Sequence, residues 1–436
     1  MDIHEGLTKK FALTASVAAL SLLAAACSGT SVSNSGGSAG SGTGTINLWA
    51  RDSDQSFIKQ IVDDYNGSQK DVQVKLTIIP AANFVQKFGA AAATGSAPDV
   101  AAIDLVYLPY FASKSTIEDL TSRTKTLNYM DKLSPAHLKL AKYQGKMYAM
   151  PFSAEASVLY YNKDLFKKAG LDPNKPPTTQ TEVVTAAKKI RALGADTYGY
   201  YFSGACGGCL IFTAMPYLWA AGGDLLQGEG PNAKAIIDSS PGVKDGLTFF
   251  KELWDAGVVP AGAKSDTGAN FNGPFQTGKV GMYGGGAFAV GTLSADKKLN
   301  FGITPLPGKT AAQTGSFAGG DEIAIPSGSK NKDAAWKFIK WVTDAEAQTA
   351  LGKLGPVPVR TDVASGAYAK QSPFNPLLAK EMAVGNNVYS THYNDLINSN
   401  NGPWVQLFQQ AVFAGDVPGA ISTGQRQFTK ILATQQ

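Results

Sequence analysis

The apolar positions of the stretch 45–104 alternate between the two periods that distinguish strands from helices. Strands are expected over 45–50, 71–79 and 98–104, and helices over 54–69 and 82–94. The order strand, helix, strand, helix, strand predicts a parallel sheet covered by helices, an α/β fold. In such sheets ligands bind beyond the carboxyl ends of the strands, where Arg51 and Asp104 stand.

The helical period returns later in the chain. "PPTTQTEVVTAAKKIRALG" starts with Thr179 and Glu182 at the spacing of a capping box and ends at a glycine. The stretches 243–257 and 332–351 each predict one amphipathic helix. A chain of 436 residues is long for one core. The sequence therefore predicts two cores with several chain crossings between them.

The first 45 residues have a different composition from the rest. Lys9 and Lys10 precede an apolar run over 11–26, which ends in three alanines and is followed by Cys27. The run is shorter than the roughly 20 residues of a membrane-spanning helix. It indicates a signal peptide over 1–26, with Cys27 either lipidated or simply following an ordinary cleavage site.

The stretch 27–45 follows the apolar run and contains no charged and no aromatic residue. Such a composition cannot bury enough apolar surface to fold. It is interpreted as a flexible tether that holds a globular body near a membrane surface, or else as a disordered tail without a task. Localisation outside the cytoplasm, anchored by an N-terminal lipid such as palmitate, is the expectation.

Cysteine and histidine are scarce in the rest of the chain. The motif "CGGC" holds Cys206 and Cys209, which could form a redox pair, part of a zinc site or a disulfide in a small loop. Export and the lack of further metal ligands favour the disulfide. His137 follows a predicted helix start and is expected at the surface. No nucleophile motif accompanies it, so a serine hydrolase is not expected. Too few ligands remain for a zinc site, and no glycine-rich nucleotide-binding motif follows a strand, so neither a metal nor a cofactor is expected.

Six motifs then stand in a recognisable order. They are "GSAPDVAAID", "MPFSAEASVLYYNKDLFKKAGLDPNKPPT", "AAGGDLL", "FQTGKVGMYGGGAF", "ITPLPGK" and "GGDEIAIPSGSKNKDAAWKFIKWVTDAEAQ". The chain from about residue 46 onward resembles the family-1 extracellular solute-binding proteins, the carbohydrate receptors of ABC importers, which include maltose-binding protein. The resemblance implies a periplasmic-binding-protein-like fold with two hinged lobes and a central ligand cleft. Lobe one is expected over 46–154 plus 320–362, and lobe two over 155–319 plus 363–436.

The resemblance also implies residues that contact the sugar. Glu155 aligns with an acidic sugar ligand of the family, and Phe288 with a stacking aromatic residue. The other candidates are strand-end or crossing residues and aromatic residues: Arg51, Asp52, Ser53, Asp54, Asp104, Tyr107, Trp219, Gly286, Gly320, Asp321 and Trp404. Asp321 and Glu322 together are also interpreted as a solvated corner. "CGGC" departs from maltose-binding protein and lies near the expected cleft wall.

Carboxylates that accept sugar hydroxyls and rings that cover C–H faces suit this function independently of the family. The predicted function is a monomeric, non-enzymatic receptor that delivers a carbohydrate to ABC permease subunits, with no nucleic-acid partner. The alternatives are a surface sugar sensor or adhesin, and a secreted glycosidase that would use Glu155 and Asp104 as its two carboxyl groups. The sequence leaves the identity of the sugar open.

Overall fold

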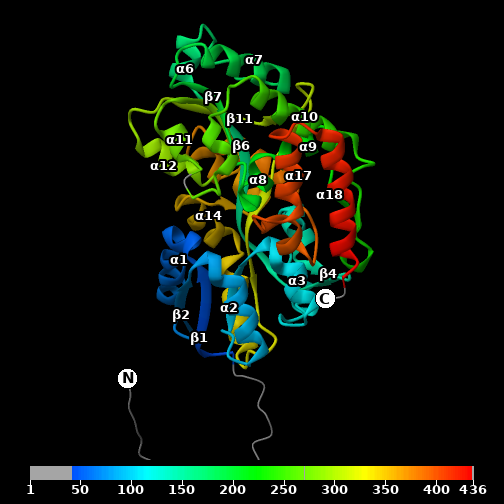
Figure 1. Cartoon of the computed structure of the whole chain (residues 1–436). Coiled ribbons are helices and arrows are strands. Elements are labelled where there is room, and N and C mark those ends of the chain that lie inside the picture. The colour runs from blue at the N-terminus through cyan, green and yellow to red at the C-terminus, as the bar shows by residue number, and fades with distance from the viewer. Residues whose placement is uncertain (1–41, 270, 435–436) are drawn as a thin grey trace, which may run out of the picture. The chain divides into compact units, whose positions relative to one another are not determined.

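The computed structural model describes residues 42–269 and 271–434, which belong to one compact unit (Figure 1). A nine-stranded mixed sheet runs through it in the order β2-β1-β3-β14-β6-β10-β7, and β11 and β15 also pair with β6. The strands of this sheet are β1 Gly44–Arg51, β2 Val72–Ile79, β3 Val100–Asp104, β6 Met150–Asn162, β7 Tyr198–Tyr201, β10 Val280–Gly286, β11 Phe301–Thr304, β14 Ala318–Ala324 and β15 Val357–Pro358.

The predicted strands and helices of 45–104 are confirmed. β2, β1 and β3 are parallel neighbours, with α1 (Gln55–Ser68) and α2 (Ala81–Ala93) in the connections between them. The parallel part is extended by β14, which lies antiparallel to β3 and places Asp321 opposite Asp104. The carboxyl ends of β1 and β3 and the middle of β14 therefore meet at one edge.

Strand β6 is thirteen residues long and is shared by the two halves of the sheet. Its first part pairs with β14 as far as Ala156, and its second part pairs with β10 from Ser157 onward. Glu155 lies opposite Gly319 of β14, one residue before Ala156, the last residue of β6 that pairs with β14. The chain thus passes from one half of the sheet to the other just after Glu155.

Helices cover both halves of the sheet (Figure 1). The remaining α-helices are α3 Leu108–Ser113, α4 Thr121–Thr124, α5 Pro135–Leu140, α6 Lys163–Lys168, α7 Gln180–Arg191, α8 Gly207–Thr213, α9 Met215–Ala220, α10 Pro241–Asp255, α11 Gly273–Gln276, α12 Ala289–Ala295, α13 Lys332–Val342, α14 Ala345–Lys353, α15 Thr361–Ser365, α16 Asn375–Val384, α17 Pro403–Val412 and α18 Val417–Leu432. Short two-residue strands form three further pairs: β4 Lys142–Tyr143 with β5 Lys146–Met147, β8 Leu226–Gln227 with β9 Lys234–Ala235, and β12 Leu306–Pro307 with β13 Thr314–Gly315. A π-helix spans Asn394–Asn398, and 3-10 helices include Asp52–Asp54 and Leu105–Tyr107.

Helix 332–351, predicted as continuous, is two helices in the structure, α13 and α14. Asp344 accepts a hydrogen bond from the backbone N–H of Ala347 at 2.8 Å and so caps α14. Thr343 Oγ1 at the end of α13 donates to the carbonyl of Ile339 at 2.9 Å. A cap residue that satisfies free N–H groups starts a new helix even where the apolar period continues.

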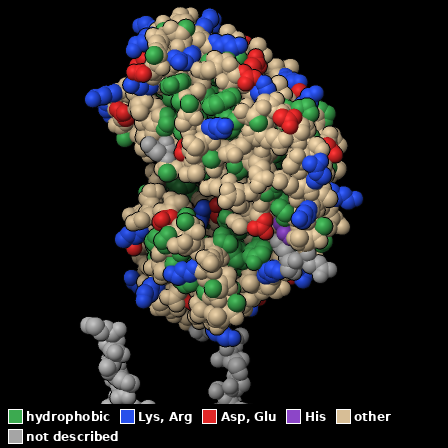
Figure 2. Space-filling model, viewed as in Figure 1, with side chains coloured by type: hydrophobic (Ala, Val, Ile, Leu, Met, Phe, Trp, Pro, Cys, Tyr) green, Lys and Arg blue, Asp and Glu red, His purple; other side chains and the backbone are tan. Residues whose placement is uncertain are grey.

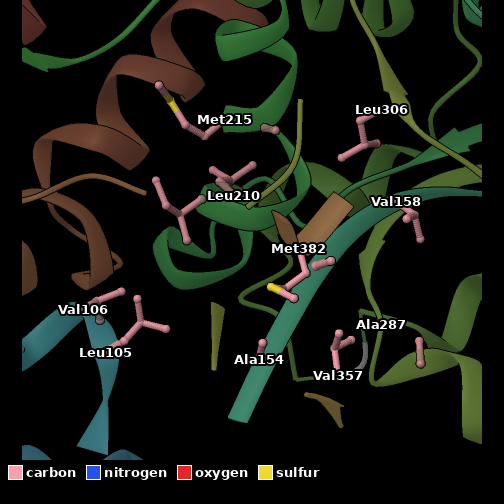
Figure 3. Close-up of a cluster of buried hydrophobic side chains, with 14 of the residues drawn as sticks. Leu105, Val106, Ala154, Val158, Leu210, Met215, Ala287, Leu306, Val357 and Met382 are labelled. Carbon is pink, nitrogen blue, oxygen red and sulfur yellow. The ribbon is translucent and has the colours of Figure 1, made fainter. Parts of the chain in front are cut away.

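The structure has two clusters of buried apolar side chains, but they do not correspond to the two halves of the sheet. One large cluster of buried apolar side chains contains Leu48 from the first half of the sheet and Tyr200 from the second. Figure 3 shows side chains of this cluster, among them Leu210 and Met382, gathered around β6. A smaller cluster around Phe84, Phe88 and Ile103 lies under β1 to β3. The core is continuous because β6 is buried along nearly its whole length.

The predicted signal peptide, Cys27 and nearly all of the tether lie outside the described residues. Within 42–269 and 271–434, no helix combines the length and the apolar character that crossing a bilayer requires.

Candidate functional site

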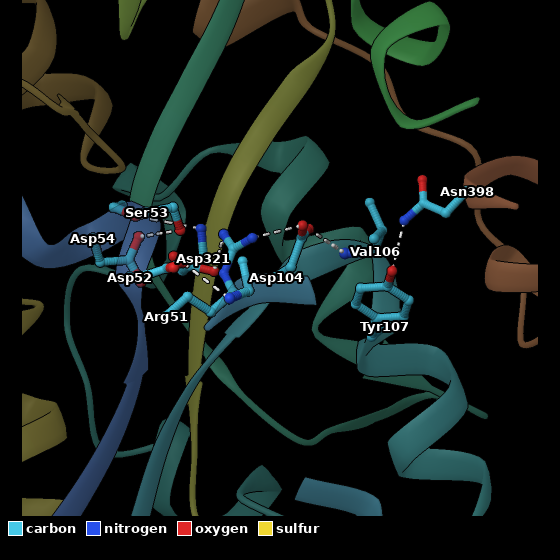
Figure 4. A network of polar contacts seen from close by, with 11 residues as sticks. Arg51, Asp52, Ser53, Asp54, Asp104, Val106, Tyr107, Asp321 and Asn398 are labelled. Atoms are coloured by element: carbon cyan, nitrogen blue, oxygen red, sulfur yellow. Dashed lines mark hydrogen bonds and ion pairs between the residues drawn. The ribbon is translucent and has the colours of Figure 1, made fainter. Parts of the chain in front are cut away.

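Two strand-end side chains, those of Arg51 and Asp104, meet Asp321 from the middle of β14 where β1, β3 and β14 come together (Figure 4). Arg51 Nη1 donates to Asp104 Oδ2 at 3.0 Å, and Arg51 Nη2 donates to Asp321 Oδ1 at 2.6 Å. The side chains of Arg51, Asp104 and Asp321 are 16%, 27% and 1% exposed. With Asp54 they form what we call the Arg51 cluster. Asp321 and Glu322 do not form the solvated corner that the sequence suggested, because β14 lies between β3 and β6 and buries both.

Asp54 enters the cluster from the 3-10 helix that follows β1. It is 4% exposed, and its Oδ2 atom, like Oδ2 of Asp321, has no hydrogen-bond partner among the described residues. Burial raises the pKa of Asp54 and of Asp104, and raises that of Asp321 well above its usual range, while Arg51 acts in the opposite direction. One guanidinium thus faces three carboxyl groups and offsets part of the effect of burial on each of them.

Glu155 lies on β6, the strand that pairs with β14, and is joined to the second half of the fold. Its Oε2 atom accepts a hydrogen bond from the backbone N–H of Phe288 at 2.9 Å. Burial raises the pKa of Glu155 to about 8, so the side chain is protonated at neutral pH. The carboxyl group can therefore donate one hydrogen bond as well as accept others, unlike the charged acceptor expected from the sequence.

Four phenylalanine rings form an aromatic wall beside Glu155: Phe212, Phe271, Phe288 and Phe317. The ring of Phe212 lies with its centroid 5.5 Å from Phe271, 6.0 Å from Phe288 and 6.4 Å from Phe317. Phe288 is 46% exposed, an unusually open position for a ring of this size. An exposed ring that neighbouring rings hold in place is suited to stack on an apolar ligand face.

The Arg51 cluster, Glu155 and most of the aromatic wall line one cleft of about 530 Å³. A second cavity of about 520 Å³ adjoins it and shares Ser53, Phe57, Glu155, Phe288 and Pro356 with it. Figure 2 shows a hollow at mid-height on the left, in the region where Figure 1 has α12 above and α1 below. Together the two cavities offer the room of a ligand of sugar size or larger.

The crossing strand β14 approaches β6 closely at the cleft. Gly320 has φ +117°, and a Cβ atom there would lie 2.1 Å from the carbonyl oxygen of Ser153, so no other residue fits. The carbonyl of the preceding Gly319 binds His137 Nε2 at 2.9 Å, and Ser134 Oγ lies 2.8 Å from Nδ1. His137 is buried, which lowers its pKa to about 4, and the expectation of a surface histidine is wrong.

The "CGGC" loop forms the start of α8 at the edge of the cleft. The sulfur atoms of Cys206 and Cys209 are joined in the structure, and Gly208 between them lines the cleft. The backbone N–H of Gly207 donates to Asn400 Oδ1 at 3.1 Å. The sulfurs pack against Gly268, where a Cβ atom would lie 2.3 Å from Cys209 Sγ. The loop thus positions α8, which carries Phe212, against the cleft.

Most of the predicted site residues come together in this cleft. Those that line it are Arg51, Ser53, Asp54, Asp104, Glu155, Gly286, Phe288, Gly320 and Asp321.

The other four predicted site residues do not line the cleft. Asp52 instead accepts a hydrogen bond from the backbone N–H of Ala81 at 2.9 Å, and Tyr107 Oη accepts one from Asn398 at 2.6 Å. Trp219 Nε1 donates to Asp224 at 3.3 Å, and Trp404 is fully buried in the large core cluster. Trp219 and Trp404 thus pack within the fold, away from the cleft.

Several residues that line the cleft were not predicted from the sequence. They include Phe57, Ser153, Phe212, Tyr393 and Asn398. In the sequence, Phe57 and Phe212 cannot be distinguished from apolar residues of the core. Asn398 lies in a polar stretch that contains no motif. Phe212 lies three positions after the "CGGC" motif, and its closeness to this motif is the one sequence feature that could have placed it at the cleft.

Among the described residues, no group of three or more histidine, cysteine or acidic side chains is placed to hold a metal ion. The cleft instead combines carboxyl groups, one guanidinium and aromatic rings, which suits noncovalent recognition of a polar molecule with an apolar face.

The comparisons with known proteins agree with this geometry. The maltooligosaccharide ABC transporter solute-binding lipoprotein of Streptococcus pneumoniae is 26% identical over 392 residues, covering 86% of each protein. The maltotriose-binding protein of Pyrococcus abyssi is 24% identical over 345 residues, covering 76% of this chain and 70% of that protein.

Among solved structures, the cyclic alpha-maltosyl-1,6-maltose binding protein from Arthrobacter globiformis superposes with a TM-score of 0.79 at 27% identity, over 89% of this chain and 99% of that one. This likeness confirms the expected two-lobed α/β fold. Residues 60–376 match the sequence profile described as "Bacterial extracellular solute-binding protein". The profile spans well over half of the sequence, and the chain belongs to this family of bacterial extracellular solute-binding proteins.

Proposed function

We propose that the protein is the substrate-binding component of an ABC importer, which captures a carbohydrate in its cleft and delivers it to membrane permease subunits. The observation that carries the proposal is the arrangement of the Arg51 cluster and the exposed ring of Phe288 around one cleft of about 530 Å³. Sugars present hydroxyl groups at their edges and C–H groups on their faces. Carboxyl groups bind the former and aromatic rings cover the latter.

The relatives support this proposal. The Streptococcus protein is named for maltooligosaccharides and an ABC transporter, and the Pyrococcus protein for maltotriose. All three relatives described above are named as binding proteins, which supports a receptor over a glycosidase. We propose that Arg51, Asp104, Glu155 and Phe288 contact the sugar.

The lobe boundaries follow from the same proposal. Lobe one comprises 46–154 plus 320–362, and lobe two comprises 155–319 plus 363–436. The change of strand partner along β6 between Ala156 and Ser157 supports a boundary close to residue 155. Closure of the two lobes on the ligand would bring Glu155 and the Arg51 cluster to it together.

A thermal-shift screen with maltooligosaccharides and other neutral sugars tests the proposal. A ligand at a hundred times its Kd adds about 2.7 kcal/mol to the free energy of unfolding, so a bound sugar is expected to raise Tm clearly. The variant Phe288→Ala is expected to lose most of the rise, because it removes the exposed ring and keeps the backbone N–H. Leu193→Ala is the matched control, since Leu193 is 38% exposed and lies outside both cavities.

Two outcomes would contradict the proposal. If no carbohydrate raises Tm of the native protein, the cleft does not bind sugars. If chromatography of the incubated oligosaccharides shows cleavage products, the protein is a glycosidase.

We also propose that Cys27 carries a lipid that anchors a monomeric protein outside the cytoplasm, and that Cys206 and Cys209 are oxidised there. The name of the Streptococcus relative as a lipoprotein supports the anchor. In a bacterial host, wild type is expected in the membrane fraction with a lipid label, and Cys27→Ala in the soluble fraction without it. Equal fractionation of the two forms with no label in either would show that Cys27 is not lipidated.

A further inference from the structure

The cleft of about 530 Å³ continues differently at its two ends. At one end it runs into the cavity of about 520 Å³ through shared residues that include Ser53 and Phe288. At the other end lies a third cavity, of about 370 Å³, and among the described residues Tyr393 alone lines both spaces. Figure 4 shows Ser53 and Asn398 at opposite ends of the polar network. The cleft is thus open toward Phe288 and nearly closed toward Tyr393.

Three side chains separate the cleft from the third cavity, and we call Tyr107, Tyr393 and Asn398 the end wall. Asn398 lines the cleft, Tyr107 lines the third cavity, and Tyr393 lines both. Asn398 Nδ2 donates to Tyr107 Oη at 2.6 Å, and Figure 4 shows the two groups directed toward one another. The rings of Tyr107 and Tyr393 meet edge to face with their centroids 6.3 Å apart. A hydrogen bond and a ring contact therefore join the three side chains into one barrier.

The end wall is held in place by the elements that carry it. Tyr107 ends the 3-10 helix Leu105–Tyr107, which follows β3 directly. Tyr393 and Asn398 stand at the two ends of the π-helix Asn394–Asn398. Tyr393 is 1% exposed and packs in the large core cluster. Because the backbone on both sides is part of regular structure, the barrier keeps its position when a ligand enters the cleft.

The third cavity offers the same kinds of groups as the cleft. Its lining includes the rings of Tyr107 and Tyr110 and the amide of Gln86. The hydroxyl of Tyr393 is buried and has no hydrogen-bond partner among the described residues. The volume lies within the range of small-molecule sites, and rings with a few polar groups are the usual lining of such sites. Without the end wall, a sugar chain in the cleft would find a further place to bind here.

We propose that Tyr107 and Asn398 limit the length of the carbohydrate chain that this protein binds. This inference rests on the proposed function and adds a specificity determinant to it. A chain in the cleft ends against the end wall and extends only toward Phe288, so a further unit on the Tyr393 side meets the barrier. A protein selects its ligand by such steric exclusion as well as by attractive contacts.

Calorimetric titration with two series of neutral chains tests the inference. The series are the maltooligosaccharides of one to seven units and the cellooligosaccharides of one to six units. In wild type the affinity should stop rising at some chain length. In Tyr107→Ala, which removes the ring from the barrier, the rise should continue for at least one more unit. The longest chain should gain about fivefold or more relative to the disaccharide, the ratio of one added neutral hydrogen bond.

The comparison uses the ratio of two affinities within one protein, so a uniform loss caused by damage to the fold cancels. Tyr110→Ala is the matched control, because it removes the same side chain from the same cavity, and Tyr110 is not part of the end wall. Its length dependence should be that of wild type. Asn398→Ala opens the barrier from the cleft side without removing a ring, and it should shift the length dependence in the same direction as Tyr107→Ala.

The outcomes separate this inference from the proposed function. If chains bind and both variants of the end wall keep the length dependence of wild type, the inference fails and carbohydrate binding stands. An equal shift in Tyr110→Ala would also overturn it. If neither series binds, the inference fails, and any sugar that raises Tm in the thermal screen keeps the proposed function. If no sugar raises Tm either, both fail.

Discussion

Replacing Arg51 by methionine is expected to lower the free energy of unfolding by about 3–5 kcal/mol at neutral pH, the usual loss when one partner of a buried ion pair is removed. The substitution keeps much of the side-chain volume but leaves Asp104 and Asp321 without their shared cation. Asp321 is 1% exposed, so water cannot take the place of the guanidinium. Urea unfolding curves of wild type and variant measure the difference.

The same contacts determine how the stability loss in Arg51→Met depends on pH. Arg51 lowers the pKa of both carboxyl groups against the effect of burial, so removing it raises both pKa values further. A carboxyl group with a raised pKa in the folded state stabilises the fold below its unfolded pKa and loses that contribution as pH rises. The Arg51→Met defect should therefore be largest at neutral pH and smaller in acid.

Arg123→Met is the matched control for this experiment. Arg123 Nη2 also lies 2.6 Å from a carboxylate, that of Asp333, but the two side chains are 27% and 49% exposed. Such surface pairs contribute about 1 kcal/mol or less. A defect of similar size in both variants would mean that the Arg51 cluster does not depend on buried charge.

Replacing Glu381 by glutamine is expected to stabilise the protein at alkaline pH relative to acid. Glu381 lies on α16, is fully buried, and neither of its carboxyl oxygens has a hydrogen-bond partner among the described residues. Burial raises its pKa from 4.5 to about 7. Between these values the folded protein holds a proton that the unfolded chain has lost, so the free energy of unfolding falls as pH rises.

The loss across that window is about 3 kcal/mol, the free energy that corresponds to a pKa difference of about 2.5. Glutamine has no proton to lose, so the difference between variant and wild type should grow by this amount from acidic to alkaline pH. Denaturation curves at several pH values measure it. Glu346→Gln, an exposed position on α14, should show no such growth. A constant difference for Glu381→Gln would show that Glu381 is ionised in the folded protein.

Local sequence patterns predicted the helices and strands well, but they predicted the burial of individual polar side chains poorly. The strands and helices of 45–104 and the capped start of α7 at Thr179 follow from periodicity and from hydrogen bonds within a few residues. His137 was misjudged because its burial depends on the carbonyl of Gly319, 182 positions away. The burial of Asp321 and Glu322 likewise depends on the insertion of β14 between two distant strands.

Residues of the candidate site were predicted correctly where they belong to a motif that determines their place in the fold. Glu155 and Phe288 belong to motifs, and the structure brings them into direct contact through a backbone hydrogen bond. Trp404 was a candidate as an aromatic residue outside the six motifs, and the structure buries it in the core. Aromatic residues fill cores and line clefts alike, so their type alone does not distinguish the two places.

The Arg51 cluster both stabilises the fold and lines the cleft, and this limits how ligand specificity can change during evolution. Arg51 joins three strands and also lines the cleft, so a substitution there that suits a new ligand would weaken the protein that must carry it. Phe288 and Asn398 line the same cleft from exposed or partly exposed positions outside the central strands. Divergence of specificity after gene duplication, and libraries for directed evolution, should therefore begin at these residues and leave the strand ends unchanged.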